Sequence, residues 1–161
     1  MKPSSALQKF LPYQMSITSN AVSGRIAMEY RTRFGLSVPE WRVMAVLGDS
    51  GEQTQRDLTR RTLMDKVAVN RACKVLEERG YAARTPNESD GRSHLLDLTD
   101  AGRAIHDQVM PLAVEMERRI FDGFSEEELG QFRALLEKLR DQVEEFCDSG
   151  DEIESGNYGV K

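Results

Sequence analysis

The sequence predicts a mainly α-helical fold that contains one small β-hairpin. Three observations support this: apolar residues recur at helical spacing along most of the chain, capping residues precede those segments, and two short strand-like runs flank the turn signal Asp90-Gly91. With 161 residues, the chain is long enough to bury a hydrophobic core of its own.

The first part of the chain is predicted to be helical from about Ser4 to Phe34, and Gly35 is a typical helix terminator. A capping-box pattern follows, in which Ser37 accepts from the amide of Glu40 and the Glu40 carboxylate reaches back. We therefore expect a second helix, which continues to about Gly48.

Two short helices are predicted next. Thr54 is the expected N-cap of the first, which ends near Thr62, and the second extends from about Asp65 to Arg79. The apolar positions of the second helix share one face: Val69, Ala72, Cys73 and Leu76. The opposite face carries Lys66, Val67, Asn70, Arg71 and Lys74. Two short helices around a tight turn, the second with a basic and polar outer face, form a candidate helix-turn-helix.

A hairpin and a long helix complete the middle of the chain. The strand-like runs extend from Tyr81 to Thr85 and from His94 to Leu98, and Arg92 lies at the tip between them. Thr99 is expected to cap a long helix that begins at Asp100.

The last predicted helix carries a narrow apolar stripe. Ser125 and Glu128 form a second capping-box pattern in front of it. Apolar residues then recur at steps of three and four: Leu129, Phe132, Leu136, Leu139, Val143 and Phe146. Such a stripe favours packing against a partner helix, so we expect a homodimer; burial within one chain is the alternative.

Charge is distributed unevenly along the chain. The net charge is -5, but residues 54–93 contain nine Lys and Arg against six Asp and Glu, and residues 125–154 contain three against eleven. The predicted helix-turn-helix and hairpin are therefore basic, so the net charge does not exclude nucleic acid as a partner. We expect an acidic, disordered tail over residues 148–161.

Several classes of protein are not supported by the composition. Cys73 and Cys147 are far apart, and His94 and His106 lie in no motif, so we expect no metal, no cofactor and no enzymatic activity. The two histidines are interpreted as hydrogen-bonded surface residues. We find no signal-peptide pattern and no apolar stretch long enough to span a membrane, and therefore expect a cytoplasmic protein.

Three segments resemble the MarR family of transcription regulators. Residues 90–102 read Asp-Gly-Arg-Ser-His-Leu-Leu-Asp-Leu-Thr-Asp-Ala-Gly, which resembles the family pattern Asp-x-Arg followed by Leu-x-Leu-Thr-x-x-Gly. Residues 75–81 resemble the end of the family's recognition helix, and residues 36–44 resemble the start of its second helix. Thr59 departs from the pattern, because an alanine is usual there.

The resemblance implies a winged helix-turn-helix DNA-binding domain over residues 37–99. Residues 1–36 and 100–147 are then the helical dimerisation region, in which the N- and C-terminal helices of two subunits intertwine. The implied partners are double-stranded DNA with a near-palindromic sequence, a second copy of the chain, and a small-molecule effector.

On this interpretation, the second short helix reads the major groove. Asn70 and Arg71 are the best base readers, because an amide pairs with adenine and a guanidinium with guanine, each through two hydrogen bonds. Lys66 and Lys74 suit phosphates, and Val67 suits a thymine methyl group. An ordinary solvated helix face is the alternative.

The hairpin would act as the wing. By resemblance, Arg92, beside Ser93, enters the minor groove, where a narrow A/T-rich groove concentrates negative potential. Asp90 would brace the wing rather than face DNA. At the start of the preceding helix, phosphate contacts are expected from Thr54, Gln55 and Arg56.

The resemblance also implies a ligand site between the dimer helices and the winged domain, with release from DNA and derepression as the usual result. Aromatic carboxylates and phenolics are frequent ligands in the family. The candidate contacts are Tyr13, Ser16, Asn20, Trp41, Arg42 and Met44. For a hydroxycinnamoyl-CoA-type thioester, Arg31 and Arg33 would hold the nucleotide phosphates. The alternative is that Trp41 and Met44 are core residues.

Two other functions are compatible with the sequence. The first is a winged helix that contacts only proteins, which predicts no salt-dependent DNA affinity. The second is a regulator that senses oxidation through Cys73, although a thiol on the apolar face of a helix is usually inert.

Overall fold

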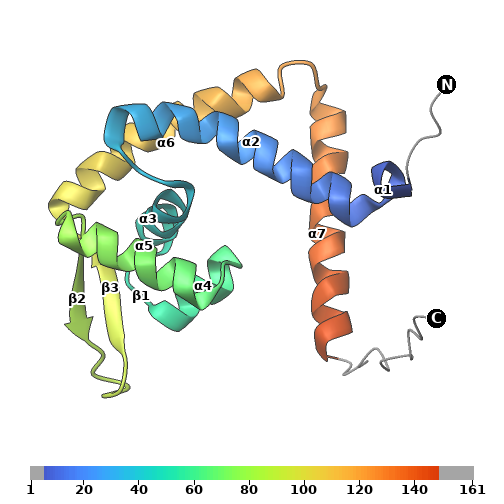
Figure 1. The fold of residues 1–161 in the computed structure, drawn as a ribbon. Helices are drawn as coiled ribbons and strands as arrows, with labels where there is room; N and C mark the ends of the chain where they lie inside the picture. Colours follow the sequence, from blue (N-terminus) through green and yellow to red (C-terminus); the bar gives the residue numbers. More distant parts are fainter. Residues whose placement is uncertain (1–5, 149–161) are drawn as a thin grey trace, which may run out of the picture. The chain divides into compact units, whose positions relative to one another are not determined.

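The computed structural model describes residues 6–148 (Figure 1). The elements in chain order are α1 (Ala6–Lys9), α2 (Leu11–Phe34), α3 (Val38–Ser50), β1 (Gln53–Thr54), α4 (Gln55–Thr62), α5 (Lys66–Glu78), β2 (Ala82–Pro86), β3 (His94–Leu98), α6 (Asp100–Ile120) and α7 (Glu126–Asp148). The fold is therefore mainly helical with a small antiparallel sheet, as predicted. The predicted acidic tail, apart from its first residue, lies outside the described residues.

Contacts divide the chain into two units, Met1–Ile120 and Phe121–Lys161. The first contains all elements from α1 to α6, and the second contains α7. The sequence-based division into residues 37–99 and two flanking helical regions concerns roles in DNA binding and dimerisation, and it stays a prediction.

Local capping fixes the helix ends of the first unit. Gly35 ends α2 with φ 65°, and its amide donates to the Arg31 carbonyl oxygen at 2.8 Å. The predicted capping box opens α3: the Glu40 amide donates to Ser37 Oγ at 3.4 Å, and the Ser37 amide donates to Glu40 Oε2 at 2.9 Å. These short-range hydrogen bonds orient α3 relative to the end of α2.

The sheet has three antiparallel strands in the order β1-β3-β2. In the hairpin, Arg84 of β2 pairs with Leu96 of β3, and β2 begins one residue later than predicted, at Ala82. Strand β1, which is two residues long and pairs Thr54 with Leu95, was not predicted from the sequence. This third strand attaches the hairpin to the start of α4.

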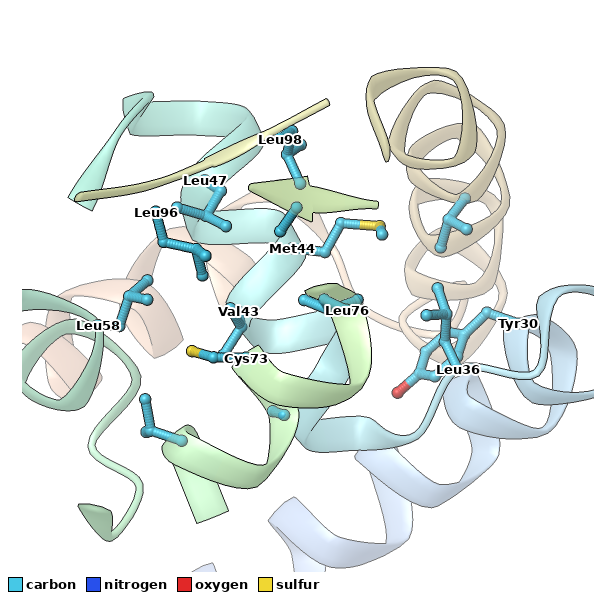
Figure 2. Close-up of a cluster of buried hydrophobic side chains, with 14 of the residues drawn as sticks. Tyr30, Leu36, Val43, Met44, Leu47, Leu58, Cys73, Leu76, Leu96 and Leu98 are labelled. Atoms are coloured by element: carbon cyan, nitrogen blue, oxygen red, sulfur yellow. The ribbon is translucent and has the colours of Figure 1, made fainter. Parts of the chain in front are cut away.

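The core of the first unit is centred on α3, α5 and the sheet, and it extends to residues of α2, α4 and α6 (Figure 2). Its largest fully buried side chains are Leu36, Met44, Leu47, Leu58, Leu76, Val43, Val69, Val109 and Cys73. Leu96 and Leu98 of β3 close it on the sheet side. The predicted apolar face of α5 therefore faces the core.

A close backbone approach joins the hairpin to α6. A Cβ atom on Gly102 would lie 1.9 Å from the carbonyl oxygen of Tyr81, so only glycine fits there. Thr99 secures the same junction: its amide donates to the Tyr81 carbonyl at 3.1 Å, and its hydroxyl donates to the Gly80 carbonyl at 2.6 Å. The Gly102 amide in turn donates to Thr99 Oγ1, which confirms the predicted cap of α6.

The second unit contains α7 and the turn before it. The predicted capping box is present, with the Glu128 amide donating to Ser125 Oγ at 3.2 Å and the Ser125 amide donating to Glu128 Oε2 at 2.7 Å. Phe121 lies beside Phe124 and Phe132, with ring centroids 5.4 and 6.2 Å away. No helix within residues 6–148 combines the length and apolar character needed to cross a membrane.

Candidate nucleic-acid interface

Helix α5 separates its side chains cleanly into two faces. Val69, Ala72, Cys73 and Leu76 are buried, whereas the five side chains predicted to face DNA are all exposed: Lys66, Val67, Asn70, Arg71 and Lys74. Figure 2 shows Cys73 and Leu76 directed into the core beside Val43. One surface of this helix therefore carries the amide side chain of Asn70 and three cationic side chains, together with Val67.

The start of α5 is fixed by its N-cap. Asp65 Oδ1 accepts a hydrogen bond from the Ala68 amide at 2.8 Å. The exposed residues Lys66 and Val67 thus lie in the first turn, which is the part of a recognition helix that meets base edges. The turn before it contains Leu63 with φ 51°, a left-handed conformation that no turn signal in the sequence indicated.

The start of α4 is organised by Thr54 and Asp57. Thr54 Oγ1 accepts from the Asp57 amide at 3.1 Å and donates to Asp57 Oδ2 at 2.6 Å. The Thr54 hydroxyl, together with Arg60, holds the pKa of the Asp57 carboxyl below its usual value. Beside this cap, Arg56 is exposed and Gln55 is half-buried, so the predicted phosphate contacts lie at a well-formed helix start.

The tip of the hairpin is held by Asp90. Its Oδ1 accepts from the Arg92 amide at 3.1 Å, and its carbonyl accepts from the Ser93 amide at 2.9 Å. Asn87 Nδ2 also donates to Ser93 Oγ at 2.9 Å. Asp90 thus binds backbone within the tip while Arg92 is exposed, which is the geometry expected if Asp90 braces the wing.

Arg84 links the hairpin to α5, a contact that the sequence analysis did not identify. Its Nε lies 2.8 Å from Glu77 Oε1, so an ion pair joins β2 to the last turn of the candidate recognition helix. Figure 1 shows the hairpin beside α5. The wing and the helix are therefore connected by a charge pair as well as by the sheet.

Helix α4 and the wing enclose a cavity of about 630 Å³. The predicted phosphate and wing residues meet here: Thr54, Gln55, Arg56, Arg92 and Ser93. Arg60 and Arg84 also line it, which makes four arginines against the two carboxylates of Asp57 and Asp90. The cavity is thus a basic hollow that suits an anionic backbone.

Cys73 lies in the core beneath this surface. It is a free thiol with 1% exposure, and burial raises its pKa to about 11. A buried, protonated thiol is a poor nucleophile, so the geometry gives no support to oxidation sensing through Cys73.

Among the predicted ligand contacts, Tyr13 lies far from Trp41 within one chain. Trp41 stacks on His106 and lies tilted against Tyr30, and both ring centroids are 5.8 Å away. Tyr13 precedes Tyr30 by seventeen residues on the same helix, which separates them by roughly 25 Å. The three α2 residues Tyr13, Ser16 and Asn20 are exposed.

The remaining ligand candidates, on α2 and α3, differ in burial and in the contacts that their side chains make. Met44 is fully buried in the core, so a ligand would reach it only after the core opened. Arg42 Nη2 donates to Ser23 Oγ at 3.4 Å, and Arg33 forms an ion pair with Glu29 at 3.6 Å. Arg31 is exposed at the end of α2, and the ligand role of all these residues stays a prediction.

The two histidines differ from each other. His94 is exposed at the start of β3, as expected; His106 pairs with Asp107 Oδ1 at 3.2 Å, as expected of a hydrogen-bonded histidine, but it is only partly exposed. The His106 side chain is only 17% exposed, because it stacks on Trp41 and fills the space where a Cβ on Gly48 would lie. Within residues 6–148, no three His, Cys, Asp or Glu side chains are grouped so as to hold a metal ion.

A winged helix-turn-helix is thus assembled from α3, α4, α5 and the three-stranded sheet, with its basic residues on one surface. This is the architecture of a class of DNA-binding transcription regulators. The model of the MarR family matches residues 34–93 of this chain.

Two comparisons define the family further. The transcriptional regulator PecS of Dickeya dadantii is 32% identical over 111 residues, which cover 67% of each chain. A MarR/EmrR family regulator from Acinetobacter sp. ADP1, solved by crystallography, is 27% identical with a TM-score of 0.80 and covers 86% of this chain and 98% of its own. This chain therefore belongs to the MarR family of transcriptional regulators.

A further crystal structure shares the fold at lower identity. CouR from Rhodococcus jostii RHA1, bound to p-coumaroyl-CoA, is 23% identical with a TM-score of 0.72, and the match covers 84% of this chain and 95% of CouR. The mainly helical winged fold is thus confirmed by structures as well as by sequence.

Proposed function

We propose that this chain is a homodimeric repressor that binds a near-palindromic operator and is released by a small aromatic ligand. The observation that carries the proposal is the exposed face of α5, on which an amide and three cationic side chains stand opposite a fully buried face. A helix with this division inserts its outer face into the major groove while the core holds it in place.

Base readout is assigned to Asn70 and Arg71. Both are exposed on α5, and each side chain offers paired hydrogen-bonding groups that match one base edge. Lys66 is assigned to a phosphate. Lys74, whose Nζ lies 3.7 Å from Glu78 Oε1, exchanges that weak surface pair for a phosphate on binding.

The wing and the start of α4 are assigned to the DNA backbone and the minor groove. Asp90 accepts a hydrogen bond from the Arg92 amide, which holds the backbone of Arg92 at the tip of the hairpin. The Arg92 side chain itself is exposed to solvent. Arg56 and the Thr54 cap line the same basic hollow. A phosphate that enters the hollow meets side chains from both elements.

The homodimer is supported by apolar surface in each unit taken alone. In the second unit, five of the six stripe residues on α7 are exposed: Phe132, Leu136, Leu139, Val143 and Phe146. In the first unit, the N-terminal region exposes Leu7, Phe10, Leu11, Met15 and Ile17. A second copy of the chain is the partner that the family implies for both surfaces.

The ligand proposal rests on the aromatic and basic residues of α2 and α3. Trp41 is half-buried in an aromatic stack, and Arg31 is exposed at the C-terminal end of α2. Because Tyr13 lies far from Trp41 within one chain, we propose that the site is completed between subunits. The p-coumaroyl-CoA bound to CouR is an example of the aromatic thioester class that such a site takes.

The proposal is tested by DNA binding with and without effectors. The purified protein is titrated with duplex DNA from its own upstream region at several salt concentrations, with a panel of aromatic acids and their CoA thioesters. We expect affinity that falls with salt and is abolished by one compound. If no candidate promoter binds even at low salt, the protein-contact function replaces this one.

A further inference from the structure

The two most exposed large apolar side chains of the described residues lie at the entrance to α5. Leu63, in the turn between α4 and α5, is 82% exposed, and Val67, in the first turn of α5, is 69% exposed. Single exposed apolar residues are ordinary, but here two lie four positions apart on the surface assigned to DNA. We call these two side chains the apolar tip.

The backbone at Leu63 is strained as well. Its φ of 51° and ψ of 27° are left-handed, and within the described part of the chain it is the only residue other than glycine with positive φ. Glycine or asparagine adopts this conformation at little cost, whereas a leucine does not. Leu63 thus carries a backbone penalty and a solvated apolar side chain, and such strain gathers at functional positions.

The side chains around the apolar tip indicate which kind of partner binds it. Lys66 lies between its two residues, and a cavity of about 610 Å³ beside it is lined by Gln55, Arg56, Thr59, Arg60 and Lys66. Three of these five side chains are cationic and none is apolar. If an apolar groove of another protein covered the apolar tip, these cations would face apolar surface. DNA instead offers phosphates to the cations and, in the groove between its two backbones, an apolar group to the apolar tip.

The apolar group that DNA presents in its major groove is the C5-methyl of thymine. We infer that Leu63 and Val67 contact thymine methyl groups, and that Leu63 is a specificity-determining residue of this regulator. The inference rests on the proposed function, because it requires α5 to lie in the major groove. It extends the thymine-methyl contact predicted for Val67 to Leu63, a residue outside the helix.

The first test needs no variant of the protein. The full chain is used to enrich sequences from duplex DNA with a randomised core, and the best duplex is then synthesised with deoxyuridine in place of thymidine at one position at a time. Deoxyuridine removes only the methyl group and keeps the base pair. We expect affinity to fall about fourfold for each contacted methyl, since each buried carbon group contributes on that scale.

Two variants assign the effect to the apolar tip. In Leu63→Gly, the new residue adopts positive φ readily, so thermal stability is retained or raised while the preference for thymine over deoxyuridine is lost at one position. In Val67→Ala, the preference is reduced at a neighbouring position. Asp49→Ala, at an exposed residue of α3 that is assigned to no DNA, ligand or dimer contact, serves as the control and keeps both the affinity and the preference.

Each outcome has a distinct meaning. If the enriched duplex binds equally well with thymidine or deoxyuridine at every position, this inference is overturned and the proposed function stands. The same holds if a thymine preference exists but persists in both Leu63→Gly and Val67→Ala, because other residues then read the methyl groups. If the wild-type protein enriches no duplex, the proposed function and this inference both fail.

Discussion

Arg79, at the end of the candidate recognition helix, donates to the backbone carbonyl oxygen of Phe34, at the end of α2, over 2.6 Å. A second guanidinium nitrogen donates to the Gly35 carbonyl at 3.0 Å, and the guanidinium lies 4.7 Å above the ring of Tyr81. One arginine thus ties the C-terminal ends of two helices that are more than forty residues apart in sequence.

Replacing Arg79 is therefore expected to destabilise the first unit. Arg79→Ala should lower the free energy of unfolding by about 1–2 kcal/mol, because two charge-assisted hydrogen bonds and a cation–π contact are lost. The free energy of unfolding of Arg79→Lys should lie between those of the wild type and Arg79→Ala, since an ammonium cannot bind both carbonyls in the same geometry. Urea unfolding measures the change. Arg25→Ala, which removes an exposed pair with Glu29, is the control and should cost under about 0.5 kcal/mol.

Two glycines should respond oppositely to alanine. Gly102→Ala places a Cβ against the Tyr81 carbonyl, so backbone must move, and we expect a loss of about 2–3 kcal/mol. Gly24 lies inside α2 with nothing within 4 Å of its would-be Cβ, so Gly24→Ala should gain up to about 1 kcal/mol. Thermal unfolding of both variants decides this, and a stable Gly102→Ala would contradict the described junction.

Cys73 should be unreactive in the folded chain. Its pKa of about 11 keeps the thiol protonated at neutral pH. In a Cys147→Ser background, iodoacetamide should label Cys73 at neutral pH only after unfolding. Rapid labelling of the native protein would instead revive oxidation sensing.

The same thiol predicts a dependence of stability on pH. The folded-state pKa is raised above the ordinary value of 9.0, so the unfolded chain loses its proton first. The contribution of Cys73 is fully present below pH 9 and is lost as the pH rises toward about 11. Urea unfolding across this range should show a smaller decline in Cys73→Ala than in the wild type.

Arg92 and Asn70 should affect DNA binding in different ways. Arg92→Ala is expected to weaken binding to all sequences and to lower the salt dependence, whereas Asn70→Ala should relax preference at one base pair by roughly 1–3 kcal/mol. Titrations with the operator and its single-base variants separate the two patterns. Arg119→Ala, at an exposed ion pair on α6, should change neither. Parent-like binding by both site variants would refute the docking geometry.

The apolar stripe of α7 should control the oligomeric state. Leu139→Lys places a charge on the stripe and is expected to shift the protein toward monomer and weaken operator binding, since a dimer holds two recognition helices. Glu137→Lys on the same helix introduces the same residue outside the stripe. Analytical ultracentrifugation compares them, and equal behaviour would place the dimer interface elsewhere.

The features predicted well from sequence depend on nearby residues. The capping boxes at Ser37 and Ser125 and the two faces of α5 were all correct, because each needs only neighbours within a turn or two. The spacing of apolar residues along a helix also indicates directly which side chains are buried. It cannot say whether a buried residue such as Met44 lines a ligand site or only the core, since both face inward.

The features missed from sequence depend on long-range pairing. Strand β1 is two residues long and exists only because β3 lies beside it. The Arg84–Glu77 pair joins a strand to a helix, and the stacking of His106 on Trp41 joins α6 to α3. Leu63 was missed because its sequence lacks the glycine or asparagine that usually indicates positive φ.

Thr54 is at once the last residue of β1 and the cap of α4, so the sheet that carries the wing runs straight into the helix-turn-helix. With Arg84 binding Glu77 as well, two separate contacts hold the wing strands against the helix-turn-helix. On the proposed docking, the distance along DNA between the major-groove and minor-groove contacts is then constant for each subunit. Operators of this regulator should consequently keep an invariant half-site length and differ only in the number of base pairs between the two halves.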